Sequence, residues 1–198
     1  MFQPSLVDAP GAIERRQLGD GAWLDVACGW FGPGADDLFV RLVDTVAWKA
    51  ERRPMYDRIV DVPRLVRFYR PEEPWPDPAL VDACTRLSHR YEPELGEPLV
   101  TCGLCYYRDG HDSVAWHGDT IGRAKVEDTV VAIVSLGSER KLALRPKGGG
   151  ASLSFVLGHG DLLVMGGSCQ RTWEHSIPKT ARPAGPRISI QFRPRGVR

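Results

Sequence analysis

Three residues in the second half of the chain have the types and spacing of a mononuclear metal site. His117 and Asp119 form a His-x-Asp pair, and His175 follows 56 positions after Asp119. Two imidazoles and one carboxylate hold non-haem iron(II) on one face and leave the opposite coordination positions open. Residues two apart in a strand share a face, so His117 and Asp119 can address one ion if the fold returns His175 to it. The set predicts an iron ion that does chemistry.

Two arginines follow the second histidine in a pattern that suits a diacid. In the run RISIQFR at 187–193, Arg187, Ser189, Gln191 and Arg193 alternate with apolar residues, which predicts a strand with one polar face. A guanidinium matches a carboxylate in bidentate geometry, and a buried arginine without an anion is costly. Together with the iron ligands, the two arginines predict an oxygenase that uses 2-oxoglutarate and O2.

Two helices and a series of short strands are expected to position these residues. Apolar residues recur at helical spacing over 38–46 and over 80–91, and Asp77-Pro78 forms an N-cap and N1 pair for the second helix. The segment 59–69 reads as a further strand or two, and 70–77, with three prolines, reads as a loop. Eight strands are predicted at 99–107, 112–117, 129–136, 140–145, 152–157, 161–166, 173–177 and 187–193. This order predicts a mainly β fold with flanking helices, a double-stranded β-helix or jelly roll.

Length and composition indicate one domain that folds without disulfides. The chain has 198 residues, a net charge of +1 and five cysteines, an odd number without a disulfide framework. Cys102 and Cys105 spell C-x-x-C, but strand alternation places them on opposite faces, so we interpret them as buried thiols. No segment approaches the roughly 20 apolar residues of a membrane span. We expect a cytoplasmic monomer with no membrane partner.

Positive charge is concentrated in one segment. Residues 49–70 contain seven basic and three acidic groups, and aromatic residues are interleaved with them. Arginines mixed with aromatics suit a polyanion with exposed bases, because phosphates meet arginine and bases stack on rings. The alternative is a solvated, arginine-rich surface.

The chain resembles the AlkB family of iron(II)- and 2-oxoglutarate-dependent nucleic-acid dealkylases. The resemblance runs from about residue 50 to 195 and rests on Pro63-Arg64 with Tyr69, YRDGHDSVAWHGD, VSLG at 134–137, GHGDLLVMGG at 158–167, WEHSIPK at 173–179 and RISIQFR. It implies oxidative removal of an alkyl group from a base in DNA or RNA, with Fe(II), 2-oxoglutarate and O2. It also implies a division of the single domain into an extension with a helix at 1–48, a nucleotide-recognition lid at 49–77 and a jelly-roll catalytic core at 99–195.

The resemblance also implies roles for single residues. His117, Asp119 and His175 would be the iron ligands. Arg187, with Tyr107, would bind the distal carboxylate of 2-oxoglutarate, and Arg193 would meet the carboxylate nearer the keto group. Ser189, a further co-substrate residue, and Cys105 stand where the family commonly has asparagine. The expected substrate contacts are Arg52, Arg53, Arg64 and Tyr69, with Trp116 as a pocket wall, although Tyr69 and Trp116 could equally be core aromatics.

One departure from the family pattern concerns the substrate. Many members read H-x-D-x-D/E, and the last acid contacts the base, whereas this chain has Ile121 there. An isoleucine cannot accept a hydrogen bond from an amine. Two alternatives therefore stay open: a 2-oxoglutarate-dependent hydroxylase of a protein side chain or small metabolite, and a non-catalytic metal-binding jelly-roll module.

Overall fold

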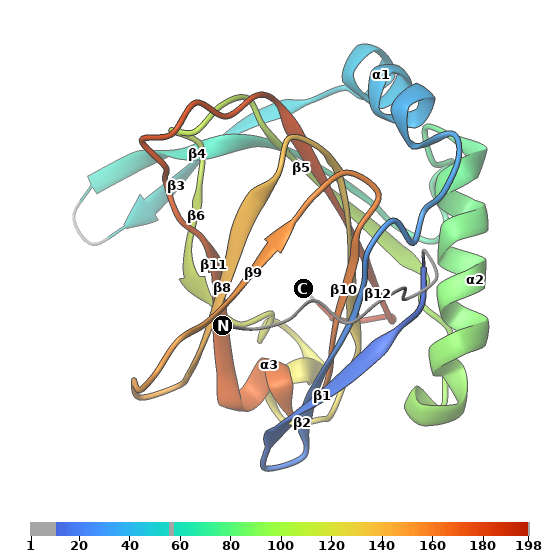
Figure 1. The fold of residues 1–198 in the computed structure, drawn as a ribbon, viewed down its shortest axis with the longest axis vertical. Helices are drawn as coiled ribbons and strands as arrows, with labels where there is room; N and C mark the ends of the chain where they lie inside the picture. The colour runs from blue at the N-terminus through green and yellow to red at the C-terminus, as the bar shows by residue number, and fades with distance from the viewer. Residues whose placement is uncertain (1–10, 56–57, 198) are drawn as a thin grey trace, which may run out of the picture.

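The chain folds into two facing antiparallel sheets with two long helices packed on one of them (Figure 1). The computed structural model describes residues 11–55 and 58–197. The larger sheet has the strand order β1-β2-β10-β7-β12-β5-β4-β3, and the smaller sheet has the order β6-β11-β8-β9. This arrangement is a jelly-roll core with flanking helices, so the predicted fold class is confirmed.

The elements have the following bounds. The larger sheet contains β1 (Glu14–Gly19), β2 (Ala22–Ala27), β3 (Lys49–Met55), β4 (Arg58–Tyr69), β5 (Thr101–Tyr107), β7 (Val131–Gly137), β10 (Leu162–Gly167) and β12 (Arg187–Arg193). The smaller sheet contains β6 (Val114–His117), β8 (Arg140–Pro146), β9 (Leu153–Leu157) and β11 (Trp173–Ile177). The helices are α1 (Ala35–Thr45), α2 (Pro78–Leu95), the short α3 (Cys169–Thr172) and the 3-10 turn η1 (Arg123–Lys125).

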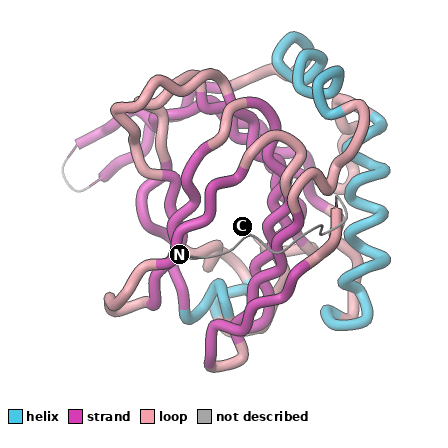
Figure 2. Tube along the Cα trace, viewed as in Figure 1, coloured by secondary structure: helices cyan, strands magenta, loops and turns pink. Residues whose placement is uncertain are grey.

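The core has two layers, one on each face of the larger sheet. Helices α1 and α2 cover its outer face (Figure 2), where Ile188, Ile190 and Phe192 of β12 are fully buried. The inner face packs against the smaller sheet through a second apolar cluster that includes Ile133 and Leu142. Because adjacent strand residues face opposite sides, the polar residues of β12 must face the interior between the sheets. The polar face predicted from RISIQFR therefore lies inside the molecule.

Local sequence explains how α2 begins and ends. Asp77 accepts a hydrogen bond from the Ala79 backbone N–H at 2.9 Å, and Pro78 occupies the first helical position. Gly96 ends the helix in the left-handed region at a φ of 77°. No helix in the described part of the chain is both long and apolar enough to span a membrane.

All eight predicted strands, the two helices and the strand within 59–69 are present. The prediction for residues 1–48, an extension with one helix, was incomplete because it contained no strands. Residues 14–27 form the hairpin β1–β2, and β2 pairs with β10 inside the larger sheet. This hairpin escaped prediction because β1 is a polar edge strand and β2 carries the charged Asp25 at a fully buried position. Residues 14–27 thus contribute to the larger sheet of the jelly roll.

Candidate metal centre and active site

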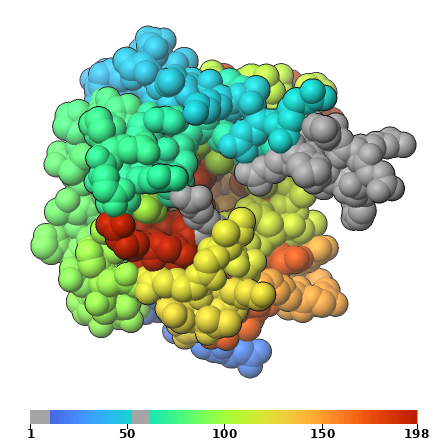
Figure 3. All heavy atoms as spheres, turned by 180° about the vertical axis from the view of Figure 1, so that it is seen from behind, coloured from blue at the N-terminus to red at the C-terminus, as the bar shows by residue number. Residues whose placement is uncertain are grey.

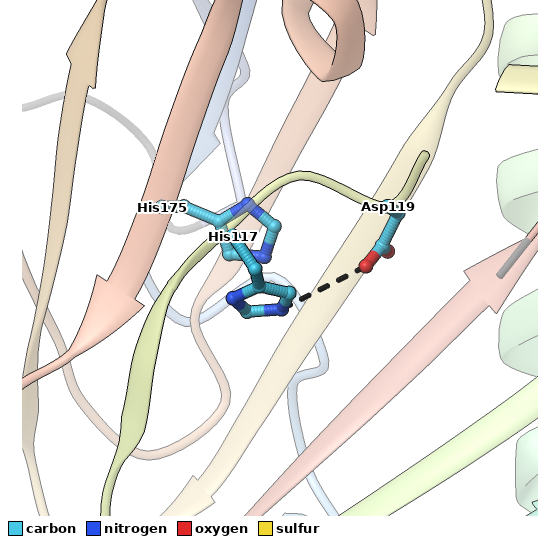
Figure 4. A group of neighbouring side chains, drawn as sticks. All are labelled: His117, Asp119 and His175. Atoms are coloured by element: carbon cyan, nitrogen blue, oxygen red, sulfur yellow. Dashed lines mark ion pairs between the residues drawn. The ribbon is translucent and has the colours of Figure 1, made fainter. Parts of the chain in front are cut away.

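The two sheets bring His117, Asp119 and His175 together. His117 ends β6 and is paired directly with His175 of β11, and Asp119 lies on the loop that follows β6. The two imidazole rings have centroids 4.2 Å apart, and one potential ligand atom from each of the three residues lies within 4.8 Å of the others. The three side chains point toward one another (Figure 4). This is the convergence that one metal ion requires.

Hydrogen bonds leave the correct atoms available for a metal. Nδ1 of His117 contacts the Ala115 carbonyl at 2.9 Å, which leaves Nε2, 3.8 Å from Oδ1 of Asp119, free to coordinate. Oδ2 of Asp119 accepts a hydrogen bond from Nε of Arg193 at 2.7 Å, and Nη2 of Arg193 lies 2.7 Å from the same oxygen as an ion pair. Asp119 can therefore offer Oδ1 to a metal while Arg193 holds its other oxygen.

The protonation states also suit a metal. Burial alone would raise the pKa of Asp119, but the charge of Arg193 and the nearby His175 and His117 outweigh it and lower the pKa to about 2. Burial lowers the pKa of His175 to about 3, with a further lowering from His117. At neutral pH the carboxylate is ionised and the His175 imidazole is neutral, which are the forms that bind a divalent cation.

Arg187 is a buried cation that lacks an anion. Its side chain is completely buried, and its Nε donates a hydrogen bond to Oγ of Ser135 at 2.9 Å. Its two terminal nitrogens, Nη1 and Nη2, are buried with no hydrogen-bond partner among the described residues. Leaving donors of a charged group unpaired is costly. The two free nitrogens present the fork that a carboxylate fits.

Tyr107 lies beside this guanidinium. The Arg187 guanidinium carbon is 5.3 Å from the centre of the Tyr107 ring, and the guanidinium carbon of Arg140 is 5.6 Å from the same ring. Burial raises the pKa of Tyr107 to about 12, so its hydroxyl stays protonated and can donate a hydrogen bond to an anion. The residues present thus fit an iron ion and a dicarboxylate co-substrate.

A cavity of about 610 Å³ contains the three candidate ligands and reaches the β3–β4 hairpin. Such a volume suits a small organic ligand with a second group beside it. Part of its lining comes from β4, and another part comes from the loop after β6, which includes Ile121. The lining also contains Lys49, Glu51, Arg64, Phe68, Cys105, Tyr107, Gln191 and Arg193.

Three of the four co-substrate residues predicted from the sequence line this cavity, whereas Arg187 is not part of its lining and lies behind Tyr107, whose ring centre is 5.3 Å from the Arg187 guanidinium carbon. Tyr107, Ser189 and Arg193 line the cavity. Ser189 accepts a hydrogen bond from Nε2 of Gln191 at 2.8 Å. Arg193 is engaged with Asp119, so the structure adds a role for it that the spacing of RISIQFR did not indicate.

The predicted substrate contacts divide into three groups. Arg64 lines the cavity and donates a hydrogen bond from Nη1 to the Ser113 carbonyl at 3.1 Å. Arg52 is exposed on β3, and the side chain of Arg53 lies outside the described part of the structure. Tyr69 and Trp116 are corrections, because neither of them lines the cavity.

Strand alternation explains both corrections. Tyr69 is 6% exposed and belongs to the cluster under the helices, while its neighbour Phe68 faces the cavity. Trp116 faces away from its neighbour His117, and the guanidinium carbon of Arg145 lies 4.3 Å from its ring centre. Arg64, Val66 and Phe68 are two apart on β4 and share the cavity face, and the long side chain of Arg67 reaches the cavity as well.

The sequence did not indicate the role of one residue that supports the site. Ser135, which holds Arg187, lies within the predicted strand 129–136, but a lone serine carries no motif. Lys49 and Glu51 of the predicted lid segment, and Gln191 of the predicted polar face, also line the cavity. The ladder between β3 and β4 is irregular between Ala50 and Arg52, opposite Pro63, a residue without a backbone donor.

Comparison with known proteins places the chain among oxygenases. Residues 41–193 match the model of the 2OG-Fe(II) oxygenase superfamily. The chain is 30% identical over 222 residues to the alpha-ketoglutarate-dependent dioxygenase alkB homolog 3 of Bos taurus, covering 98% of this chain and 76% of that protein. It is 29% identical to the Homo sapiens protein of the same name, over 82% of this chain and 64% of that protein.

Two further comparisons agree. The DNA oxidative demethylase ALKBH2 of Arabidopsis thaliana is 34% identical over 110 residues, which is 44% of this chain and 35% of that protein. The solved structure of OsALKBH1 superposes with a TM-score of 0.59 at 13% identity, covering 91% of this chain and 99% of that one. At this identity the superposition shows a shared fold.

Proposed function

We propose a substrate and a reaction for this chain, which belongs to the AlkB family of iron(II)- and 2-oxoglutarate-dependent oxygenases and is therefore an oxidoreductase. The substrate is an N-alkylated base in DNA or RNA, and the reaction is oxidative removal of the alkyl group. When bound, iron(II) with 2-oxoglutarate and O2 supplies the oxidation of the alkyl carbon, after which a methyl group leaves as formaldehyde, with succinate and CO2 as co-products. Family membership sets aside the alternative of a non-catalytic metal-binding module.

The residues of the site take distinct roles in this proposal. His117, Asp119 and His175 hold the iron, and Arg193 keeps the Asp119 carboxylate ionised and oriented. Arg187 and the Tyr107 hydroxyl bind the distal carboxylate of the co-substrate. Ser189 and Gln191 offer polar groups on the same wall. The chain's own contribution is to place the reacting alkyl group beside the metal and to keep each ligand in its binding form.

The single observation that carries the proposal is the pairing of the metal triad with an unpaired buried guanidinium. A metal site alone needs no second anion site, whereas Arg187 leaves two buried donors for one. The relatives named as dioxygenases and as DNA oxidative demethylases support the nucleic-acid substrate. A base in a duplex must be flipped out of the stack to enter the cavity, where Phe68 and Arg64 would contact it.

Formaldehyde release tests the proposal. The purified protein is incubated with Fe(II), 2-oxoglutarate and a panel of single-stranded oligonucleotides that carry one N-methylated base each, with unmethylated strands as controls. We expect formaldehyde from at least one methylated strand, none from the unmethylated strands, and none from the Asp119→Ala variant. Succinate formation without formaldehyde from any strand would contradict the proposed substrate and leave the oxygenase assignment intact.

A second candidate function is favoured by one residue. Ile121 lines the cavity, is 67% exposed, and presents an apolar surface to a substrate where an acceptor for a base amine is expected. An apolar wall suits an aliphatic side chain or metabolite. Hydroxylation of a peptide or small acid, with no formaldehyde from the oligonucleotide panel, would support this candidate in place of the first.

A further inference from the structure

A buried amide side chain joins the two chain segments that carry the proposed metal ligands. Gln170 lies in α3, which leads directly into β11 and His175 (Figure 1). It is 1% exposed, and its Oε1 accepts a hydrogen bond from the backbone N–H of Asp119 at 2.8 Å. We propose that Gln170 is a positioning residue that fixes the backbone of the Asp119 loop and thereby the metal affinity of the site.

The packing around Gln170 leaves it little freedom. The side-chain Nε2 of Gln170 donates a hydrogen bond to Sδ of Met165 at 3.6 Å. The backbone carbonyl oxygen of Gln170 accepts a hydrogen bond from Nζ of Lys147 at 2.9 Å. A Cβ at Gly118 would lie only 2.6 Å from the same carbonyl oxygen, so the chain before Asp119 presses directly against α3. Residue 118 must therefore be glycine. The close packing of Gly118 on α3 and the hydrogen bond from Asp119 to Gln170 together hold residues 118–119 at a fixed place relative to His175.

The Asp119 loop needs such a contact because regular structure does not hold it. Strand β6 ends at His117, and the next regular element, η1, begins at Arg123. Arg193 grips the carboxylate of Asp119 but does not touch its backbone N–H. The loop beyond Asp119 is anchored separately, by the C-terminal segment. Nε of Arg123 donates a hydrogen bond to the Arg195 carbonyl, and Gly122 forms a β-bridge with Val197. In Figure 3 the C-terminal segment, in red, lies against this loop, in yellow. Gln170 thus supplies the backbone anchor at the ligand itself.

Manganese(II) binding tests this inference without any need for turnover. The Gln170→Met variant keeps the length of the side chain and removes the acceptor, and we expect it to bind Mn(II) roughly 10–100-fold more weakly, as loss of an outer hydrogen bond to a ligand does. The matched control is Met165→Leu, which removes the other hydrogen bond of Gln170 and retains the acceptor. This control is expected to bind Mn(II) as the parent does.

Two results would overturn the inference: parent-like Mn(II) affinity in folded Gln170→Met, or equal weakening in Met165→Leu. Should Gln170→Met not fold, hydrogen exchange in the parent decides, because the Asp119 amide must then exchange slowly, and exchange at the rate of an open loop contradicts the inference. The inference rests on the metal assignment within the proposed function. Absence of Mn(II) binding by the parent would contradict the metal assignment, whereas parent-like binding by Gln170→Met would contradict only the role of Gln170. Formaldehyde assays are not part of this test, so a wrong substrate assignment does not affect it.

Discussion

Arg187 shows how a single side chain reveals a co-substrate. Complete burial lowers the pKa of its guanidinium. Ser135 accepts a hydrogen bond from Nε only, so the donors on Nη1 and Nη2 are available to bind an anion. Replacing Arg187 with Met keeps the bulk of the side chain and removes the fork. We expect 2-oxoglutarate binding to weaken by about 1.5–3 kcal/mol, or roughly ten- to a hundredfold, with Mn(II) binding unchanged.

Calorimetric titration of the Mn(II)-loaded protein with 2-oxoglutarate measures this change. The matched control is Arg145→Met, because Arg145 lies against Trp116 and Glu174 away from the cavity. If Arg187→Met bound 2-oxoglutarate as tightly as this control, the diacid would have to bind elsewhere.

At the scale of elements, the start of α2 depends on one carboxylate. Burial alone would raise the pKa of Asp77, but hydrogen bonds from Arg41 and from the Ala79 backbone N–H outweigh it and lower the pKa. We expect Asp77→Ala to reduce the free energy of unfolding by about 0.5–2 kcal/mol at neutral pH. A lowered pKa in the folded state stabilises the protein above the unfolded value of 3.8, and this contribution is lost as the pH falls below it.

Urea denaturation of the parent and of Asp77→Ala, at neutral pH and below pH 3.8, checks both the size and the sign. The difference between the two proteins should shrink in acid. A difference that stays constant or grows in acid would show that the ionised carboxylate is not the source of the effect.

The β3–β4 hairpin is the element that we propose as the nucleic-acid lid. It projects from the edge of the larger sheet (Figure 1), and its residues form one end of the cavity. Replacing Arg52, Arg53 and Arg64 together by Gln should weaken oligonucleotide binding. The log–log salt slope should fall by about 0.7 for each phosphate of a single strand that the variant no longer neutralises.

Binding measured over a series of salt concentrations checks this prediction. A triple variant of Arg16, Arg145 and Arg182, none of which lines the cavity, is the control for the change in net charge. Identical slopes for both triple variants would show that the hairpin arginines do not contact phosphates and are a solvated surface. The hydroxylase candidate would then be favoured over the nucleic-acid substrate.

At the scale of the whole molecule, the N-terminal hairpin is tied to α2 through a buried carboxylate. Asp25 is fully buried and accepts hydrogen bonds from Nε of Arg15 at 2.7 Å and from the Tyr91 hydroxyl at 2.9 Å. We expect Tyr91→Phe to lower the free energy of unfolding by about 1.5–3 kcal/mol, because the variant cannot donate a hydrogen bond to this charged acceptor. Mn(II) affinity should not change. An unchanged denaturation midpoint would mean that the hairpin is held by its strand pairing alone.

The sequence predicted the features that depend on neighbouring residues and did not predict the contacts between segments that are far apart in the chain. The eight strands after residue 99 and the polar face of β12 follow from alternation, and His117 and His175 from their spacing. Tyr69 and Trp116 were misplaced because a resemblance gave them a role that strand alternation contradicts. Arg193 on Asp119 and Gln170 on the Asp119 backbone could not be predicted, since each joins segments that only the folded chain brings together.

The most direct test of the central claim, that His117, Asp119 and His175 hold iron and that Arg187 binds the diacid, is anomalous X-ray diffraction from crystals grown with Mn(II) and 2-oxoglutarate. We predict one strong manganese peak within bonding distance of His117, Asp119 and His175. We also predict a carboxylate of the diacid on Nη1 and Nη2 of Arg187. A manganese peak away from the three ligands, or a diacid bound apart from Arg187, would contradict the claim.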